Sequence, residues 1–306
     1  MLAEHTLVMQ RFVADGARDV VFMLHGSIEN GRVFYSASGK GLAPYLAQHG
    51  FDVFVPDLRG RGASTPHVGR HSSYGQTEII VEEIPALLQK LHALRPGVPQ
   101  HFVAHSWGGV LLAAYLARFP QQFPRPRSLV FFGTKRRIAV RHLEKRLKID
   151  LAWTYLIPIV AALWGYLPAR RLGFGSDDET RNSFLGIRAW VNAERWTDPV
   201  DGFDYGRAAQ STEYPPILSL VGIGDTYLGH PQDVERFLSE LLAKDVEHRV
   251  LSRSAGNLHD YGHVDILTHP GAPSDHFGLV LSHLTRATLV EDRGWSVSSE
   301  RGSRAS

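Results

Sequence analysis

Short β-rich runs recur along this chain, and most of them are followed by a stretch with helical spacing of its apolar residues. The runs have the apolar and β-branched content of buried strands, and they cover residues 20–24, 51–55, 101–104, 128–132, 217–221 and 247–251. The helical stretches cover residues 41–49, 76–94, 110–119, 233–242 and 275–284. This alternation predicts an α/β fold with a mostly parallel, doubly wound sheet that helices cover on both faces.

Polar residues that can carry chemistry follow several of these strands. Ser27 comes shortly after the first run, Ser106 follows the third, Asp225 follows 217–221, and the loop after 247–251 reaches His263. In open α/β sheets, ligands bind beyond the carboxyl ends of the strands. The sequence therefore predicts a serine, an acid and a histidine, in this chain order, at one edge of the sheet.

Ser106 stands in the most informative stretch of the sequence. A strand-like run ends at Ala104, a helix-forming run begins at Val110, and Ala104 and Gly108 flank the serine at two-residue spacing. This pattern predicts a nucleophile elbow, a turn so sharp that only small side chains fit beside it and the serine backbone is strained. The alternative is a serine that only caps the N-terminus of a helix.

The chain resembles the α/β-hydrolase superfamily, in the serine-hydrolase branch that includes monoacylglycerol-lipase-like esterases. The resemblance covers roughly residues 20–285 and is carried by His25-Gly26, the turn at 57–64, the Ser106 elbow and Gly262-His263-Val264-Asp265. One departure is Ala104, where glycine is usual. A second is that only about twenty residues precede Val20, so the first one or two strands of the family are expected to be short or missing.

The strand-end residues and the resemblance together predict a triad of Ser106, His263 and Asp225. His263 would take the proton of Ser106, and Asp225 would fix the tautomer of His263 and stabilise its imidazolium. The backbone N–H groups of Trp107 and Ser27 would form the oxyanion hole. The predicted reaction is the cleavage of carboxylic, lipid-like acyl esters through an acyl-serine intermediate.

The acid and the base have rivals in the sequence. Asp233 competes with Asp225, although Asp233 is better suited to the first turn of the helix that follows. The chain has 16 histidines, and His263 is preferred because Gly262 allows a tight loop and because the family places Gly-His-x-Asp there. The other histidines near it are His259, His269, His276 and His283.

Other polar residues near the strand ends receive supporting roles. His105 is expected to pack or to hydrogen-bond rather than to react. Asp57 and Arg59 are expected to brace their turn. Glu29 and Asn30 follow the predicted oxyanion turn and are candidates to line the pocket.

About eighty residues separate the strands at 128–132 and 217–221, too many for an unstructured loop in a compact domain. The resemblance implies a helical cap inserted here above the active site, and Leu143, Leu147 and Leu151 recur on one helix face. We therefore expect a hydrolase core at 1–134 and 214–290, a cap or lid at 135–213, and a polar, disordered tail at 291–306.

The cap sequence joins a basic stretch, 135–148, to an apolar stretch, 151–167. Such a pair can make peripheral contact with a membrane or lipid surface, and the alternative is a cap that packs on its own core with solvated charges. The apolar stretch contains Pro158 and falls short of the roughly 20 residues of a membrane span. Aromatic residues of the cap are candidates for the acyl pocket or the core: Trp153, Tyr155, Trp164, Tyr166 and Phe174.

The composition of the chain excludes several classes of partner and of functional site. The 306 residues carry a formal net charge of +2 and are 43% hydrophobic, a globular balance that implies no attraction to nucleic acid. The absence of cysteine excludes disulfides, a cysteine nucleophile and thiolate metal sites. The first residues lack a signal-peptide pattern, so a cytoplasmic location is expected. We expect neither a cofactor nor a metal, because Gly262 argues against a helix that would pair His259 with His263.

Two alternative functions remain open. An acyltransferase would pass the acyl group from the same triad to an alcohol or thiol, and a non-catalytic binding module would use the scaffold alone. Epoxide hydrolases and dehalogenases of the superfamily are disfavoured, because their resemblance requires an aspartate where Ser106 stands. The expected partner is a small-molecule ester, and the oligomeric state is left open.

Overall fold

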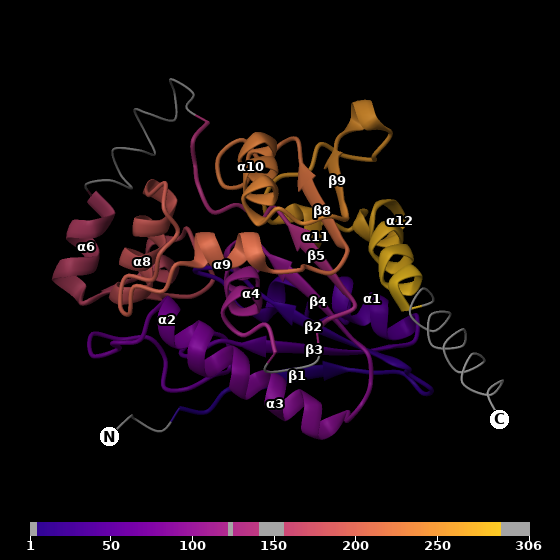
Figure 1. Cartoon of the computed structure of the whole chain (residues 1–306), viewed down its shortest axis with the longest axis horizontal. Helices are drawn as coiled ribbons and strands as arrows, with labels where there is room; N and C mark the ends of the chain where they lie inside the picture. The colour runs from indigo at the N-terminus through magenta and orange to yellow at the C-terminus, as the bar shows by residue number, and fades with distance from the viewer. Residues whose placement is uncertain (1–4, 122–124, 141–155, 289–306) are drawn as a thin grey trace, which may run out of the picture.

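The computed structural model describes residues 5–121, 125–140 and 156–288. Within these residues, a central sheet has seven strands in the order β1-β3-β2-β4-β5-β8-β9 (Figure 1). They are β1 (Val8–Phe12), β2 (Asp19–Leu24), β3 (Phe51–Asp57), β4 (Gln100–His105), β5 (Ser128–Phe132), β8 (Ile217–Gly222) and β9 (Val246–Leu251). Neighbouring strands run parallel except for the short edge strand β1, which is antiparallel to β3. The predicted doubly wound, mostly parallel sheet is confirmed.

The central strands are buried on both faces, which explains why the sequence shows continuous apolar runs there. In β2, Val20, Phe22 and Leu24 pack into one hydrophobic cluster, and Val21 and Met23 pack into a second cluster on the opposite face. The sheet therefore separates two cores, and each core is closed by its own layer of helices.

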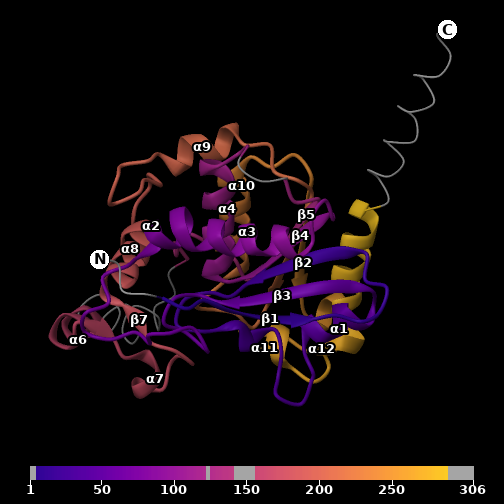
Figure 2. The ribbon, with the colours of Figure 1, turned by 90° about the horizontal axis from the view of Figure 1, so that it is seen from below.

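The two layers of helices are seen on either side of the sheet in Figure 2. One layer contains α3 (Ile84–Leu94), α4 (Trp107–Arg118) and α10 (Pro231–Leu241). The other contains α1 (Leu42–Gln48), α11 (Asp265–Thr268), α12 (Ala272–Asp275) and a helix at 277–288. Each helix predicted from the spacing is present, with bounds that differ by a few residues.

The stretch predicted as a helix at 76–94 is helical, but it is not a single α-helix. α2 (Gln76–Glu78) passes into a π-helical stretch (Ile79–Glu83) before α3 begins at Ile84. Pro85 lies in the first turn of α3. Because proline has no N–H, it cannot bond to the carbonyl four residues earlier, and the regular helical ladder is interrupted here.

We call residues 133–216 the β5–β8 segment. Its described part holds α6 (Ile157–Trp164), α7 (Ala169–Leu172), α8 (Arg181–Asn192) and α9 (Tyr205–Ser211), with a small antiparallel pair, β6 (Tyr166–Leu167) and β7 (Glu179–Thr180). α6, α7 and β7 lie beyond one end of the sheet (Figure 2). α9, in contrast, packs on α4 and joins the core. The helical content agrees with the expectation, and the division at 135–213 stays a prediction.

Several expectations for the cap fall outside the described residues. They are the face of Leu143, Leu147 and Leu151, the aromatic residues Trp153 and Tyr155, and the tail at 291–306. Trp164 and Phe174 are described, and each is more than a third exposed. These two side chains are therefore not part of a buried core.

Two cations at the start of the basic stretch are buried rather than solvated, which corrects one expectation for that stretch. Lys135 is 6% exposed and Arg136 is 1% exposed. Arg136 pairs with Glu240 of α10 and donates to the carbonyls of Trp190 and Ala193 at the end of α8. A buried guanidinium that satisfies the last carbonyls of a helix is stabilised by both the hydrogen bonds and the helix dipole.

Candidate active site

Ser106 lies in the sharp turn between β4 and α4. Its backbone has φ 51° and ψ −122°, a conformation that a non-glycine residue adopts only when its surroundings impose it. The N–H of Ser106 donates to the carbonyl of Phe132 at 2.8 Å. A Cβ atom at Gly108 would lie 2.5 Å from the carbonyl oxygens of Leu24 and His25. The spacing of small residues in the sequence therefore has a steric cause.

The Ser106 side chain makes no capping hydrogen bond to α4. Its Oγ atom lies 2.8 Å from Nε2 of His263, and Nδ1 of His263 lies 2.5 Å from Oδ2 of Asp225. The helix-cap alternative thus does not describe this serine. Three residues from three different strand ends meet in one hydrogen-bonded chain.

Glycines make room for this chain. A Cβ atom at Gly229 would lie 2.4 Å from Oδ2 of Asp225 and 3.2 Å from Nδ1 of His263. The N–H groups of Leu228 and Gly229 also donate to Oδ1 of Asp225, at 3.0 and 2.8 Å. These bonds fix the carboxylate and leave its second oxygen for His263.

The rival acid and the rival histidines have other partners. Asp233 lies in the first turn of α10 and accepts bonds from the N–H groups of Ala139 and Val140. The ring centroids of His259 and His269 lie 3.9 Å apart with the planes tilted by 49°, and His276 bonds to the carbonyl of Ile266. His283 packs near Arg286. None of these four histidines hydrogen-bonds to Ser106 among the contacts of the described residues.

The protonation of the chain follows from its burial and charges. Burial opposes ionisation of Asp225, but the hydrogen bond and charge of His263, with Lys135 and the Gly229 N–H, hold its pKa below the usual value. Burial lowers the pKa of His263 and outweighs the hydrogen bond to Asp225, and the charges of His105 and Lys135 lower it further. His263 is therefore neutral near pH 7 and able to accept a proton.

A second buried pair, His105 and Glu29, contacts the backbone of His263, and no local pattern in the sequence indicates that the two residues meet. His105 contacts Glu29 through Nδ1 at 2.7 Å and the carbonyl oxygen of His263 through Nε2 at 2.8 Å. A carbonyl only accepts and a carboxylate accepts when ionised, so both ring nitrogens donate and the ring is an imidazolium. Burial opposes this charge, but Glu29 raises the pKa of His105 overall. The hydrogen-bonding role expected for His105 is confirmed.

Glu29 stays a candidate to line the pocket, and its carboxylate has partners in the turn after β2 and in β4. It accepts the N–H of Gly26 as well as the bond from His105, so its carboxylate is used in holding the turn. Asn30 likewise donates to Asp177 of the β5–β8 segment at 2.5 Å. Both side chains are engaged in fixing the loop after β2.

The two residues expected in the oxyanion hole flank Ser106. Trp107 is the first residue of α4, where backbone N–H groups have no partner within the helix. A Cβ atom at Gly26 would lie 3.0 Å from Cβ of Ser106, so the turn that contains Ser27 runs directly beside the serine. That these N–H groups bind an oxyanion stays a prediction.

The turn after β3 is braced as expected. Asp57 accepts the N–H groups of Gly31 and Ala63, both at 2.8 Å, and thereby joins the loops after β2 and β3. The N–H of Arg59 donates to Glu83 at 2.8 Å. Neither side chain contacts Ser106 or His263 among these bonds, so the turn is architectural.

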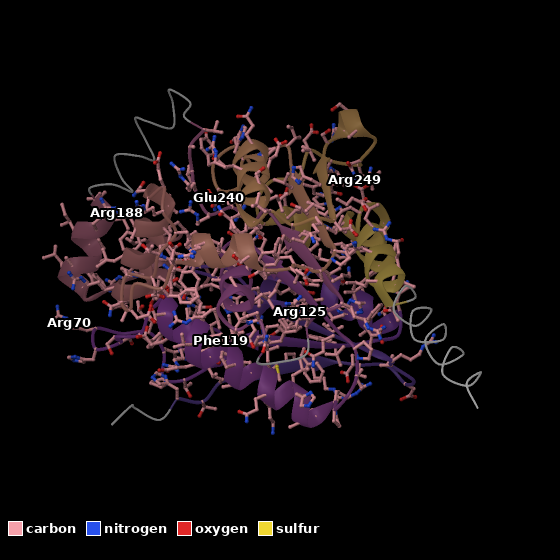
Figure 3. The ribbon with its side chains drawn as sticks, in the orientation of Figure 1. Arg70, Phe119, Arg125, Arg188, Glu240 and Arg249 are labelled. Atoms are coloured by element: carbon pink, nitrogen blue, oxygen red, sulfur yellow. The ribbon has the colours of Figure 1, made fainter. Side chains whose placement is uncertain are left out.

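A surface hollow lined by Phe119, Arg125 and Tyr214 lies at the far end of α4 from Ser106. Figure 3 labels two of these residues, Phe119 and Arg125. The hollow does not belong to the candidate site. Within residues 5–121, 125–140 and 156–288, no three His, Asp or Glu side chains are grouped so that they could hold a metal ion. In the same residues, no helix has the length and apolar character needed to cross a membrane.

Comparisons with known proteins agree with the fold described above. Residues 19–153 match the family model described as alpha/beta hydrolase fold. The "Probable lysophospholipase L2" of Haemophilus influenzae is 29% identical over 90 residues, 29% of either chain. The "Bifunctional epoxide hydrolase 2" of Rattus norvegicus is 33% identical over 104 residues, 33% of this chain and 16% of that protein. The matched stretches thus span less than a third of these relatives.

Among solved structures, a monoacylglycerol lipase from Paleococcus ferrophilus superposes with a TM-score of 0.59 at 16% identity, covering 92% of this chain and 99% of the other. At this identity the likeness concerns the fold. The sequence match, the strand order and the elbow geometry together show that the chain has the α/β-hydrolase fold.

Proposed function

We propose that the protein is a serine hydrolase that cleaves carboxylic esters. The observation that carries the proposal is the chain from Ser106 Oγ to His263 and on to Asp225, with contacts of 2.8 and 2.5 Å. A serine hydroxyl is a weak nucleophile until a base takes its proton. The depressed pKa of His263 supports its role as that base.

In the proposed reaction, His263 takes the proton of Ser106 as the oxygen attacks the ester carbonyl. Asp225 keeps the proton of His263 on Nδ1 and stabilises the imidazolium. The N–H groups of Trp107 and Ser27 bind the oxygen that becomes negative. His263 then returns its proton to the leaving alcohol. Water attacks the acyl-serine as His263 takes its proton, and His263 gives that proton to Ser106 as the carboxylic acid leaves.

A lipid-like acyl ester is the proposed substrate class. The similarity to a lysophospholipase and the fold shared with a monoacylglycerol lipase support it. The similarity to an epoxide hydrolase carries less weight, because serine rather than aspartate occupies the nucleophile position.

A covalent probe tests the proposal. A fluorophosphonate should label Ser106, and Ser106→Ala should lose both the labelling and the hydrolysis of p-nitrophenyl acyl esters. The matched control is Ser282→Ala, which removes an exposed hydroxyl that donates to the carbonyl of Gly278, in the helix at 277–288, and keeps Ser106. Labelling at another serine, or ester hydrolysis that survives in Ser106→Ala, would refute the proposal.

A further inference from the structure

The turn after β2, residues 26–28, holds an unusual backbone. Ile28 has φ 53°, and a positive φ is a genuine outlier for a β-branched residue. Such a conformation costs of order 1–3 kcal/mol and persists only where neighbours over-determine it. The residues around this turn therefore impose the conformation of Ile28.

The β5–β8 segment supplies many of them. The N–H of Asp177 donates to the carbonyl of Ile28 at 3.1 Å. The side chain of Ile28 packs with a small apolar cluster of this segment that includes Leu167 and Phe184. A Cβ atom at Gly175 would lie 2.7 Å from the Ile28 carbonyl oxygen. These residues of the β5–β8 segment thus lie in direct contact with the turn.

A buried ion pair adds to these contacts. Glu179 in β7 accepts the hydroxyl of Ser27 at 2.7 Å on one oxygen and pairs with Arg61 on the other. Arg61 also reaches the carbonyl of Gly26 at 3.4 Å. The side chains are 2% and 1% exposed for Arg61 and Glu179. The pair therefore contacts two consecutive residues of the turn from the side away from solvent.

Stability alone is a poor reason to bury these charges. Replacing a buried ion pair by apolar side chains of similar volume is often neutral or stabilising, because desolvation offsets the Coulomb gain. Among the residues that the structure describes, the Nε atom of Arg61 has no hydrogen-bond partner, so the pair is not fully satisfied there. What the pair does achieve is to fix where the turn lies relative to Ser106.

We propose that Glu179, with Arg61, is a positioning residue that orients the turn at 26–28, so that the N–H of Ser27 points to the oxygen of the tetrahedral intermediate at Ser106. This inference rests on the proposed function. It means that the β5–β8 segment contributes to the reaction through the backbone of the turn, without touching the reacting atoms.

Two variants test the inference. Arg61→Met/Glu179→Leu removes both buried charges and keeps apolar volume. Ser27→Ala removes only the hydroxyl that Glu179 accepts and keeps the N–H. The matched control is Arg136→Met/Glu240→Leu, which removes another Arg–Glu pair with a buried guanidinium. Glu240 lies on α10 (Figure 3), and Arg136 bonds to Glu240 and to the end of α8 rather than to the turn. Each variant is measured for kcat, KM, Tm and the affinity of an alkylboronic acid, whose adduct with serine is tetrahedral.

We expect kcat and boronate affinity to fall together by about 10- to 100-fold in the first double variant, a part of the 10²- to 10³-fold that loss of one oxyanion donor costs. Ser27→Ala should lower both by a smaller factor, with KM unchanged. Adding Ser27→Ala to the double variant should cause little further loss, since both act through one contact. The control should keep kcat and boronate affinity near wild type, whatever its Tm.

A merely structural role would lower Tm and leave boronate affinity unchanged, and that result would overturn the inference. Unchanged kcat and boronate affinity in Ser27→Ala would also overturn it, even if the double variant fails to fold. Failure of the wild-type protein to bind the boronate or to hydrolyse esters would instead count against the proposed function.

Discussion

Ser106 and Ile28 have nearly the same φ, 51° and 53°, yet different parts of the molecule hold them. Ser106 is held by the sheet, through the carbonyl of Phe132 and the close packing of Gly108 on β2. Ile28 is held by the β5–β8 segment, through Asp177 and the cluster around Phe184. The elbow is thus part of the two-sided core, whereas the turn depends on a segment beyond the end of the sheet.

Because of this difference, substitutions in the two regions are expected to have different effects. Strain that is held by a close-packed core is difficult to relax, because interiors transmit small displacements. Strain held by a few hydrogen bonds and one ion pair can change when that segment moves. We therefore expect changes beside Ser106 to affect stability and chemistry together, and changes beside Ile28 to affect mainly the rate.

The largest effect on kcat is expected for a substitution in the proposed triad around Ser106. Asp225→Asn should preserve the fold and lower kcat by about three to four decades, as in the protease triad, because the tautomer of His263 is no longer fixed. Steady-state kinetics and a thermal melt check it. Asp233→Asn is the control, since Asp233 binds the N–H groups of Ala139 and Val140 instead. Normal turnover in Asp225→Asn would move the acid role elsewhere.

Two glycine substitutions compare the regions directly. Gly108→Ala brings a Cβ atom to 2.5 Å from carbonyl oxygens of the strand end, and we expect it to cost about 1–3 kcal/mol of unfolding free energy together with activity. Gly175→Ala brings one to 2.7 Å from the Ile28 carbonyl, and we expect kcat to fall with little change in Tm.

Denaturant melts and kinetics on the same samples measure both effects. Gly278→Ala serves as the control, because a Cβ atom there meets nothing within 4 Å. If Gly175→Ala proved as destabilising as Gly108→Ala, the two regions would share one rigid support and the comparison would fail.

The smallest expected effect is a shift of the pH profile. The charge of Lys135 contributes to the lowered pKa of His263, so Lys135→Met should raise that pKa. His263 must be neutral to act as a base, and the acid limb of kcat/KM should therefore move to higher pH. Arg137→Met, which removes a neighbouring cation that is not among the causes of this shift, is the control. A limb that stays in place or moves to lower pH in Lys135→Met would contradict the electrostatic account.

Much of the core was predictable because its signals are local. The apolar composition of β2, β4 and β5 indicates strands that are buried on both faces, and the small residues Ala104 and Gly108 indicate a sharp turn around Ser106. The residue order of serine, acid and histidine also followed from the strand ends. These features depend on composition and on spacings of a few residues, which a sequence displays directly.

The buried charges were not predictable in the same way. The sequence left open whether the charges at 135–148 are solvated, and it did not indicate partners for Arg136 or Glu29, because a charged side chain in a sequence is usually on the surface. Their partners lie far along the chain, with 104 positions between Arg136 and Glu240 and 76 between Glu29 and His105. No local spacing marks such a pair.

The sequence by itself determined the strands, the elbow and the set of residues from which the site could be built, because steric and hydrophobic requirements act between near neighbours. Only the tertiary structure decided which histidine meets Ser106, and that Glu179 meets Ser27 across 152 positions. The physical reason is that a buried polar group must find its partner in space, and the strand order and the path of the β5–β8 segment bring the partners together.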